Sequence, residues 1–201
     1  MVIIYLDIET ESQDKEPRIR DKIITIQYKE IVEGGKNPLN HSKRMGKGEL
    51  QIICEFYEYF KGIVSRGYVQ VIGFNLLRFD VPFLIYKIIT FQIDNNLDQI
   101  FETFRKVFWR DLRYCLYTLN NLSFKGLSEE EVAKNLGLKH PEPPSREIPK
   151  LYKERNYEKI IKHIESEFEF LEGLNRKLEY ELDDIRARYK KLKEGNPCGV
   201  A

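Results

Sequence analysis

Apolar residues are grouped along this chain in short runs of strand length. Residues 2–7 and 22–28, "VIIYLD" and "KIITIQY", are rich in β-branched and apolar residues, and 69–74 ("VQVIGF") has the same composition. Residues 106–114 ("KVFWRDLRY") predict a further strand or the approach to one. We therefore expect a sheet built from these segments.

Between these runs the apolar positions follow a helical period. Residues 50–64 place apolar side chains on one face of a helix, and a second helix is expected after Pro82. Ser128 and Glu131 have the spacing of a capping box for a third helix. The pattern is helical throughout 156–194. The alternation of strands and helices predicts an α/β fold with a mixed sheet.

Two segments do not follow either period. Residues 33–49 ("EGGKNPLNHSKRMGKGE") combine glycine, proline and basic residues, which predicts a flexible basic loop. Residues 139–149 ("KHPEPPSREIP") predict an extended connector that is able to fold over a nearby cleft.

Charge and composition narrow the class of protein. The 201 residues carry 33 basic and 32 acidic side chains, so any surface for a polyanion has to be local. The sequence shows no leader, and its apolar runs are too short to cross a bilayer, which favours a soluble cytoplasmic protein. The three cysteines are scattered and lack the spacing of a zinc site.

Two carboxylates close the first predicted strand. Asp7 and Glu9 are two residues apart, so in an extended strand both point to the same side. Hard oxygen ligands of this kind suit Mg²⁺ or Mn²⁺. The pair alone does not distinguish a metal site from two solvated acids at the end of a strand.

A second motif gives the pair a context. Residues 73–84 ("GFNLLRFDVPFL") contain Asn75, Phe79 and Asp80 between a predicted strand and a predicted helix. With "YLDIET", this segment resembles the 3′→5′ exonuclease domain of family-B DNA polymerases, within the DEDD superfamily. The resemblance implies an RNase H-like sheet flanked by helices. It covers residues 1–174, and 175–201 are expected to form a C-terminal helical extension and tail.

The third motif of that family is altered here. Where the family has Tyr-x-x-x-Asp on a late helix, this sequence has His163 and Glu167. On a helical projection the two residues lie together on one flank of the predicted apolar stripe, whose members are Tyr157, Ile160, Ile161, Ile164, Phe168 and Leu171. Glu165 and Glu169 lie away from them. This geometry is compatible with a role in a cleft between helix and sheet.

The resemblance implies a mechanism and a set of residues. Two ions, Mg²⁺ or Mn²⁺, are expected on Asp7, Glu9, Asp80 and Glu167, with His163 orienting or deprotonating the attacking water. A 3′ end of single-stranded DNA is the expected substrate, and the candidate contacts are Asn75, Leu76, Phe79, Lys43 and Arg44.

Several alternatives remain open from the sequence. Phe79 is equally suited to a place in the core, and the basic loop to a solvated hairpin tip. Asp111 is expected to be a structural carboxylate near the site. The altered third motif also fits a catalytically impaired module that binds nucleic acid or serves as a scaffold, and the same chemistry on RNA is a further alternative.

The C-terminal part of the long helix carries an apolar seam. Its members recur at spacings of three and four, and they are Leu171, Leu174, Leu178, Leu182, Ile185, Tyr189 and Leu192. Such a seam either packs against the domain or pairs with a partner helix or a second copy of the chain.

Overall fold

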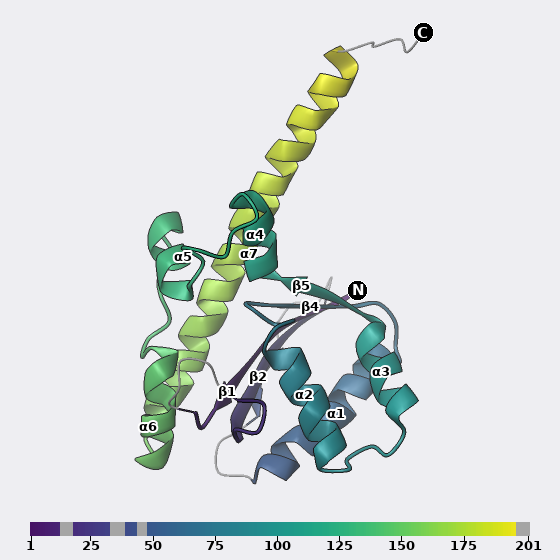
Figure 1. The fold of residues 1–201 in the computed structure, drawn as a ribbon, viewed down its shortest axis with the longest axis vertical. Coiled ribbons are helices and arrows are strands. Elements are labelled where there is room, and N and C mark those ends of the chain that lie inside the picture. The colour runs from purple at the N-terminus through teal and green to yellow at the C-terminus, as the bar shows by residue number, and fades with distance from the viewer. Residues whose placement is uncertain (13–17, 33–38, 44–47, 196–201) are drawn as a thin grey trace.

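The structure, a computed structural model, describes residues 1–12, 18–32, 39–43 and 48–195, and of residues 32, 39–43 and 182–195 it describes the backbone alone. The fold is α/β, with a mixed sheet flanked by helices and a long C-terminal helix (Figure 1). The strands are β1 (Val2–Thr10), β2 (Ile23–Val32), β3 (Leu39–Lys43), β4 (Val69–Gly73) and β5 (Val107–Asp111).

The sheet has five strands in the order β3-β2-β1-β4-β5. β1 is antiparallel to β2 and parallel to β4, and β5 is parallel to β4. β1 is therefore the central strand, and Asp7 lies opposite Gln27 of β2 in the register. Because β1 and β4 run in the same direction, their carboxyl ends meet at one edge of the sheet, where ligands gather in such folds.

Helices cover both faces of the sheet, and an apolar cluster lies under each layer. One face carries α1 (Glu49–Val64), α2 (Asp80–Thr90) and α3 (Leu97–Arg105). The other carries α4 (Leu112–Leu119), α5 (Glu129–Leu136), a 3₁₀ turn (Ser145–Glu147), α6 (Ile148–Lys153) and α7 (Tyr157–Gly195). A sheet covered on both faces explains why β1 and β4 are apolar at most positions.

The pleat of β1 determines where its acids point. Ile4, Leu6 and Ile8 belong to the cluster under α1 and α2, whereas Tyr5 belongs to the cluster under α7. Since side chains alternate along a strand, Asp7 and Glu9 lie on the α7 side. The first strand thus delivers both carboxylates toward the long helix.

The predicted elements are largely confirmed, with differences at several places. α3 was not predicted, and the connector expected to be extended is helical from Ser145 onward. α2 begins at Asp80, ahead of Pro82, and the predicted strand at 106–114 ends at Asp111 and continues as α4. The segment expected to be a basic loop contains β3, which pairs with β2. The sequence lacks a strand signal there because β3 ("LNHSK") is polar and short.

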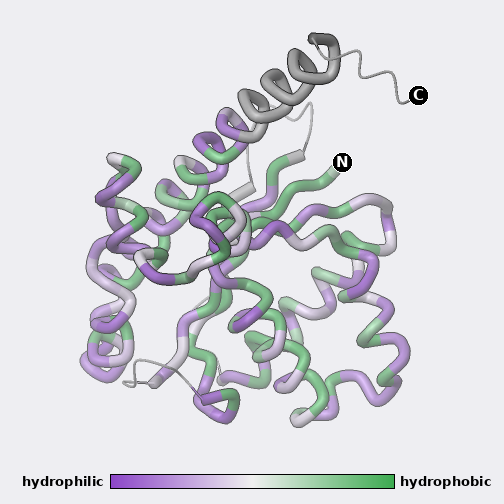
Figure 2. Tube along the Cα trace, turned by 45° about the horizontal axis from the view of Figure 1, so that its top comes forward, coloured by the Kyte–Doolittle hydropathy of each residue, from purple (hydrophilic) through white to green (hydrophobic). Residues whose placement is uncertain are grey.

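α7 is partly a core helix and partly a projection. Leu171, Leu174 and Leu178 are buried against the domain, so this part of the seam packs within the chain. Ile161, predicted to be buried, is 45% exposed. The helix continues unbroken past the predicted boundary at residue 174 and extends beyond the body (Figure 1), with hydrophilic and hydrophobic residues mixed along its described part (Figure 2). Neither α7 nor any other helix in the described ranges is apolar enough to span a bilayer.

Gly73 lies where β4 passes closest to β1. A Cβ at this position would be 2.5 Å from the backbone oxygen of Leu6 and 2.8 Å from side-chain atoms of Leu76. We expect Gly73→Ala to lower the free energy of unfolding by about 1–3 kcal/mol, since backbone cannot yield as a flexible side chain can. Urea denaturation would measure the change.

Gly62 provides the matched control. It lies inside α1, and a Cβ there would have no atom within 4 Å. Gly62→Ala should raise the free energy of unfolding by about 0.5–1 kcal/mol through helix propensity. Equal effects of the two substitutions would contradict the close approach at Gly73.

Candidate active site

A pocket of about 710 Å³ opens at the carboxyl ends of β1 and β4. It is lined by the end of β1, the segment from β4 into α2, the start of α5 and the proline-rich connector, which does fold over the cleft. Its charged or titratable lining includes Asp7, Glu9, Asp80, Glu129, His140 and Arg146. The first two motifs of the sequence therefore meet in one place.

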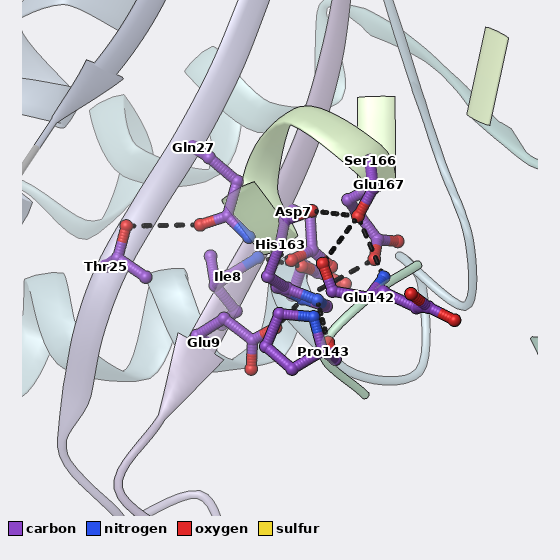
Figure 3. A network of polar contacts seen from close by, with 11 residues as sticks. Asp7, Ile8, Glu9, Thr25, Gln27, Glu142, Pro143, His163, Ser166 and Glu167 are labelled. Carbon is purple, nitrogen blue, oxygen red and sulfur yellow. Dashed lines mark hydrogen bonds and ion pairs between the residues drawn. The ribbon is translucent and has the colours of Figure 1, made fainter. Parts of the chain in front are cut away.

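A buried chain of polar side chains orients Asp7. The Gln27 amide donates a hydrogen bond to an Asp7 carboxylate oxygen, and the Thr25 hydroxyl donates to the Gln27 carbonyl at 3.2 Å (Figure 3). Thr25 and Gln27 are buried on β2, beside β1. Their place in the antiparallel register fixes the direction in which Asp7 points.

Asp80 is held against β1 by the backbone. It is the first residue of α2 and is 1% exposed, and its Oδ1 accepts a hydrogen bond of 2.9 Å from the Ile8 amide. The positive end of a helix also favours a carboxylate at this position. One contact thus joins the second motif to the strand between Asp7 and Glu9.

His163 connects α7 to both the connector and β1. Its Nδ1 lies 2.6 Å from the Pro143 carbonyl oxygen, and its Nε2 lies 2.8 Å from Glu9 Oε1. A carbonyl only accepts, so Nδ1 carries a proton, and a proton is also required between Nε2 and Glu9. Burial alone lowers the pKa of His163, but the hydrogen bond and charge of Glu9 outweigh burial and raise this pKa above its usual value. The pair is therefore best described as an imidazolium bound to a carboxylate.

Glu167 is buried without a hydrogen-bond donor. It lies one turn beyond His163, is 1% exposed, and neither of its carboxylate oxygens has a hydrogen-bond partner. Its Oε2 is 3.6 Å from His163 Nε2, an ion-pair distance rather than a hydrogen bond. An unsatisfied buried carboxylate is costly and indicates a site that takes a proton or a cation.

The connector is tied to α7 beside these residues. The Ser166 hydroxyl accepts a hydrogen bond of 2.9 Å from the Glu142 amide and lies 2.8 Å from the His163 carbonyl oxygen, to which it can donate (Figure 3). With the contact between His163 and Pro143, this fixes the wall of the pocket next to Glu9.

Burial dominates the electrostatics of the site, and repulsion between the acids adds to it. Burial raises the pKa of Asp7 well above its usual range, and the charges of Glu167, Asp80 and Glu9 raise it further. Burial raises the pKa of Asp80 and of Glu167 in the same way, with neighbouring carboxylates adding to each shift. Groups that share a site and resist ionisation together are typical of functional centres.

Glu129 is a fifth acidic residue that the sequence reasoning missed. Its partly buried position and the charge of Glu9 raise the pKa of Glu129 to about 7. Ser128 caps α5, which makes Glu129 the first residue of that helix and turns it into the pocket. The capping box predicted the start of the helix, but nothing in the sequence indicated which face of it meets the site.

The candidate contacts for nucleic acid divide into three groups. Asn75 and Phe79 line the pocket, and Phe79 also packs on Phe83 with a centroid distance of 4.5 Å. Leu76 is fully buried in the core, so the prediction that it contacts bases is wrong. Only the backbone of Lys43, at the end of β3, is described, and Arg44 lies outside the described residues.

Asp111 has the structural role expected for it. Its carboxylate accepts hydrogen bonds of 3.0 Å from the Asn75 and Leu77 amides and also caps α4. Asn75, which has a positive φ of 64°, is thereby fixed at the pocket wall, where its Oδ1 accepts from Arg113 at 3.0 Å.

The acidic residues match a divalent cation in chemistry but not as a formed coordination shell. Glu167 offers two oxygens without a hydrogen-bond partner, and Glu9 is near enough for its charge to raise the pKa of Asp7 and of Asp80. As the side chains stand, no group of three or more His, Cys, Asp or Glu residues in the described part of the chain is arranged to hold a metal ion. Cation binding would therefore require side-chain adjustment.

Comparisons with known proteins return no relative for this chain: no family model matches it, and no curated protein sequence matches it.

The raised pKa values predict how stability depends on pH when no divalent cation is present. Unfolded Asp and Glu titrate near pH 4, whereas burial and repulsion hold the folded pKa values of Asp7, Asp80 and Glu167 above this range and that of Glu129 at about 7. The folded state then binds more protons, so its stability is highest at low pH and is lost as pH rises through the folded pKa values. In EDTA the free energy of unfolding should fall from about pH 5 to about pH 8, by roughly 1.4 kcal/mol per pH unit for each retained proton. A flat or rising profile in urea titrations would contradict the buried repulsion.

The variant Glu167→Gln distinguishes the effect of repulsion between the acids from the effect of cation binding on stability. In EDTA near neutral pH we expect this variant to be more stable than the wild type by about 1 kcal/mol, because it removes one like charge from a buried cluster. Mn²⁺ should raise the melting temperature of the wild type and raise that of Glu167→Gln much less.

Glu165→Gln is the control on the same helix, since Glu165 is exposed whereas Glu167 is buried. It should behave as wild type in both conditions. If Mn²⁺ does not change the melting temperature of the wild type, this result would argue against a cation site.

Proposed function

We propose that this protein is a metal-dependent 3′→5′ exonuclease with an RNase H-like fold, acting on single-stranded DNA. The observation that carries the proposal is the meeting of acids from three distant segments, with Asp7 and Glu9 on β1, Asp80 on α2 and Glu167 on α7. Asp7 is half-buried, and the other three are buried. The order of the motifs "YLDIET" and "GFNLLRFDVPFL" along the chain supports the same reading.

The acids are the means of holding Mg²⁺ or Mn²⁺. Asp7 and Asp80 are both held in position by hydrogen bonds. The Gln27 side chain orients Asp7, and the Ile8 amide orients Asp80. Glu167 adds oxygens that have no donor within the protein. Bound divalent ions would supply an activated water and stabilise the charge on the leaving oxygen. Without cations the pocket would repel a phosphodiester, because its lining is strongly acidic.

His163 acts in this proposal by positioning Glu9. Both of its ring nitrogens are engaged with protein atoms, and the side chain is fully buried. This arrangement leaves no ring nitrogen available to take a proton from water, and it holds Glu9 beside Glu167. The general-base role expected from the resemblance therefore gives way to a structural one.

The pocket suits the end of a strand rather than a duplex. Its volume of about 710 Å³ is in the range of sites for small ligands. Phe79 offers an aromatic surface for a terminal base, while Arg113 and Arg146 line the same cavity and suit phosphate. These contacts carry no sequence information, which agrees with an enzyme that removes any terminal nucleotide.

A second candidate is a module that binds single strands without cleaving them. It is favoured by the absence, in the described ranges, of acids already gathered around an ion position, and by the engagement of Glu9 with His163. The same pocket and aromatic surface would serve binding alone.

A nuclease assay separates the two candidates. With 5′-labelled single-stranded DNA and Mn²⁺ or Mg²⁺, we expect a ladder that shortens from the 3′ end and disappears in EDTA. Asp7→Ala and Glu167→Ala should each lower the rate by roughly 10³-fold, as expected when a residue needed for chemistry is removed. A parallel RNA substrate tests the choice of sugar.

Glu165→Ala is the matched control, because it removes a carboxylate from the exposed side of α7. Its rate should equal that of the wild type. Binding of single strands without cleavage by either metal would reject the exonuclease in favour of the binding module.

A further inference from the structure

The seam of α7 continues beyond the domain that buries its first half. Starting at Ile164, apolar or buried positions recur at alternating spacings of four and three, in the order Ile164, Phe168, Leu171, Asn175, Leu178, Leu182, Ile185, Tyr189 and Leu192. The first five are each less than a tenth exposed and face the body of the domain. The last four are placed by sequence register on the same stripe, along helical backbone that extends past the body (Figure 1).

An isolated projection of this kind needs a partner. Most helical stability in proteins comes from packing an apolar face, and short helices alone in water are marginal. The period of 3.5 is that of a coiled-coil seam rather than of a solvated helix. We therefore expect the part of the stripe beyond the domain to pack against an apolar surface of another molecule.

The charges of the projection divide into two blocks of opposite sign. Residues 179–184 contain the acids Glu179, Glu181, Asp183 and Asp184, and residues 186–193 contain the bases Arg186, Arg188, Lys190, Lys191 and Lys193. Two helices of this sequence attract along their length when they run antiparallel, because each acidic block then lies beside a basic block. In heptad register Glu179 would meet Arg186 of the second helix, and Glu181 would meet Arg188.

A groove lies next to the place where α7 leaves the body. It has a volume of about 790 Å³ and lies between α4, α5 and α7. Its apolar lining includes Leu116, Leu119, Leu136 and Leu178, and Leu119 is 43% exposed. In the antiparallel register the second helix would bring Tyr189 and Leu192 beside this groove, since these positions are level with Leu178 and Asn175.

We propose that the chain forms a homodimer through antiparallel pairing of the projecting part of α7 with that of a second copy. The stripe from Leu182 to Leu192 forms the seam, and the groove beside Leu178 receives the end of the partner helix. A parallel pair is less favourable, because its attraction between Glu181 and Arg186 is offset by repulsion between Arg188 and Lys193 of the other copy. In the antiparallel pair the contacts of Arg186 and of Arg188 both attract. This inference is independent of the proposed catalytic function.

Charge reversal tests the pairing in the full-length protein. We expect the wild type to have twice the mass of one chain in light scattering and sedimentation over a wide range of concentration. Glu179→Lys with Glu181→Lys should raise the dissociation constant of the dimer roughly tenfold or more, and so should Arg186→Glu with Arg188→Glu. Each double variant has four like-charge contacts, whereas a mixture of the two restores attraction and should form a heterodimer.

The control carries the same change of charge elsewhere on α7. Glu165→Lys with Glu169→Lys alters two exposed positions on the part of the helix that packs on the domain, and should leave the dimer intact. A wild type that is monomeric at all concentrations, or a dimer insensitive to both reversals, would overturn the proposal.

Orientation is tested by a disulfide. In the antiparallel register residue 192 of one chain is level with 175 of the other, so the two copies of residue 192 are separated by 17 residues of helix, about 26 Å. Leu192→Cys in a background with Cys54→Ser, Cys115→Ser and Cys198→Ser should not give an interchain disulfide on mild oxidation. Complete cross-linking would indicate a parallel pair and reject the antiparallel arrangement.

Discussion

The arrangement of this protein depends on holding several carboxylates together in a place where they repel. Asp80 and Glu167 are both 1% exposed, and their charges and that of Glu9 raise the pKa of Asp7. Ionised acids resist transfer from water, and each one makes ionisation of the next more costly. Such a cluster persists only where the surrounding structure leaves the side chains no alternative position.

Two apolar layers provide that constraint. The central strand β1 is bonded to neighbours on both sides and covered by helices on both faces, so its carboxyl end cannot withdraw from the pocket. α7 is fixed by Ile164, Phe168 and Leu171, which flank His163 and Glu167 in sequence. The free energy that keeps the acids together therefore comes from the packing of the sheet and helices, and the acids themselves act against it.

Local patterns predicted the parts of the site that strand and helix geometry determine. The pleat of a strand placed Asp7 and Glu9 on one side, whereas Asp80, His163 and Glu167 were expected from the resemblance to a known exonuclease domain. The spacing of four residues only made it compatible with helix geometry that His163 and Glu167 lie together. Patterns of this kind could not show which elements come to lie beside the pocket. Glu129 lines the pocket because α5 packs beside it. Leu76 lies outside the pocket because its side chain packs against Gly73. β3 was missed because its polar sequence gives no strand signal, and it becomes a strand only by pairing with β2.

His163 changes the charge balance of the site in a way that tyrosine would not. As an imidazolium bound to Glu9, it supplies one positive charge among the carboxylates and offsets part of their repulsion in the protein without metal. A divalent cation would supply the same compensation from outside. The imidazolium and a cation would therefore compete for the carboxylate of Glu9, because both would interact with the same oxygen. His163 thus makes the charge balance of the acids depend on the contact that joins β1 to α7, and the two carboxylate oxygens of Glu167, which have no hydrogen-bond donor, lie beside that contact.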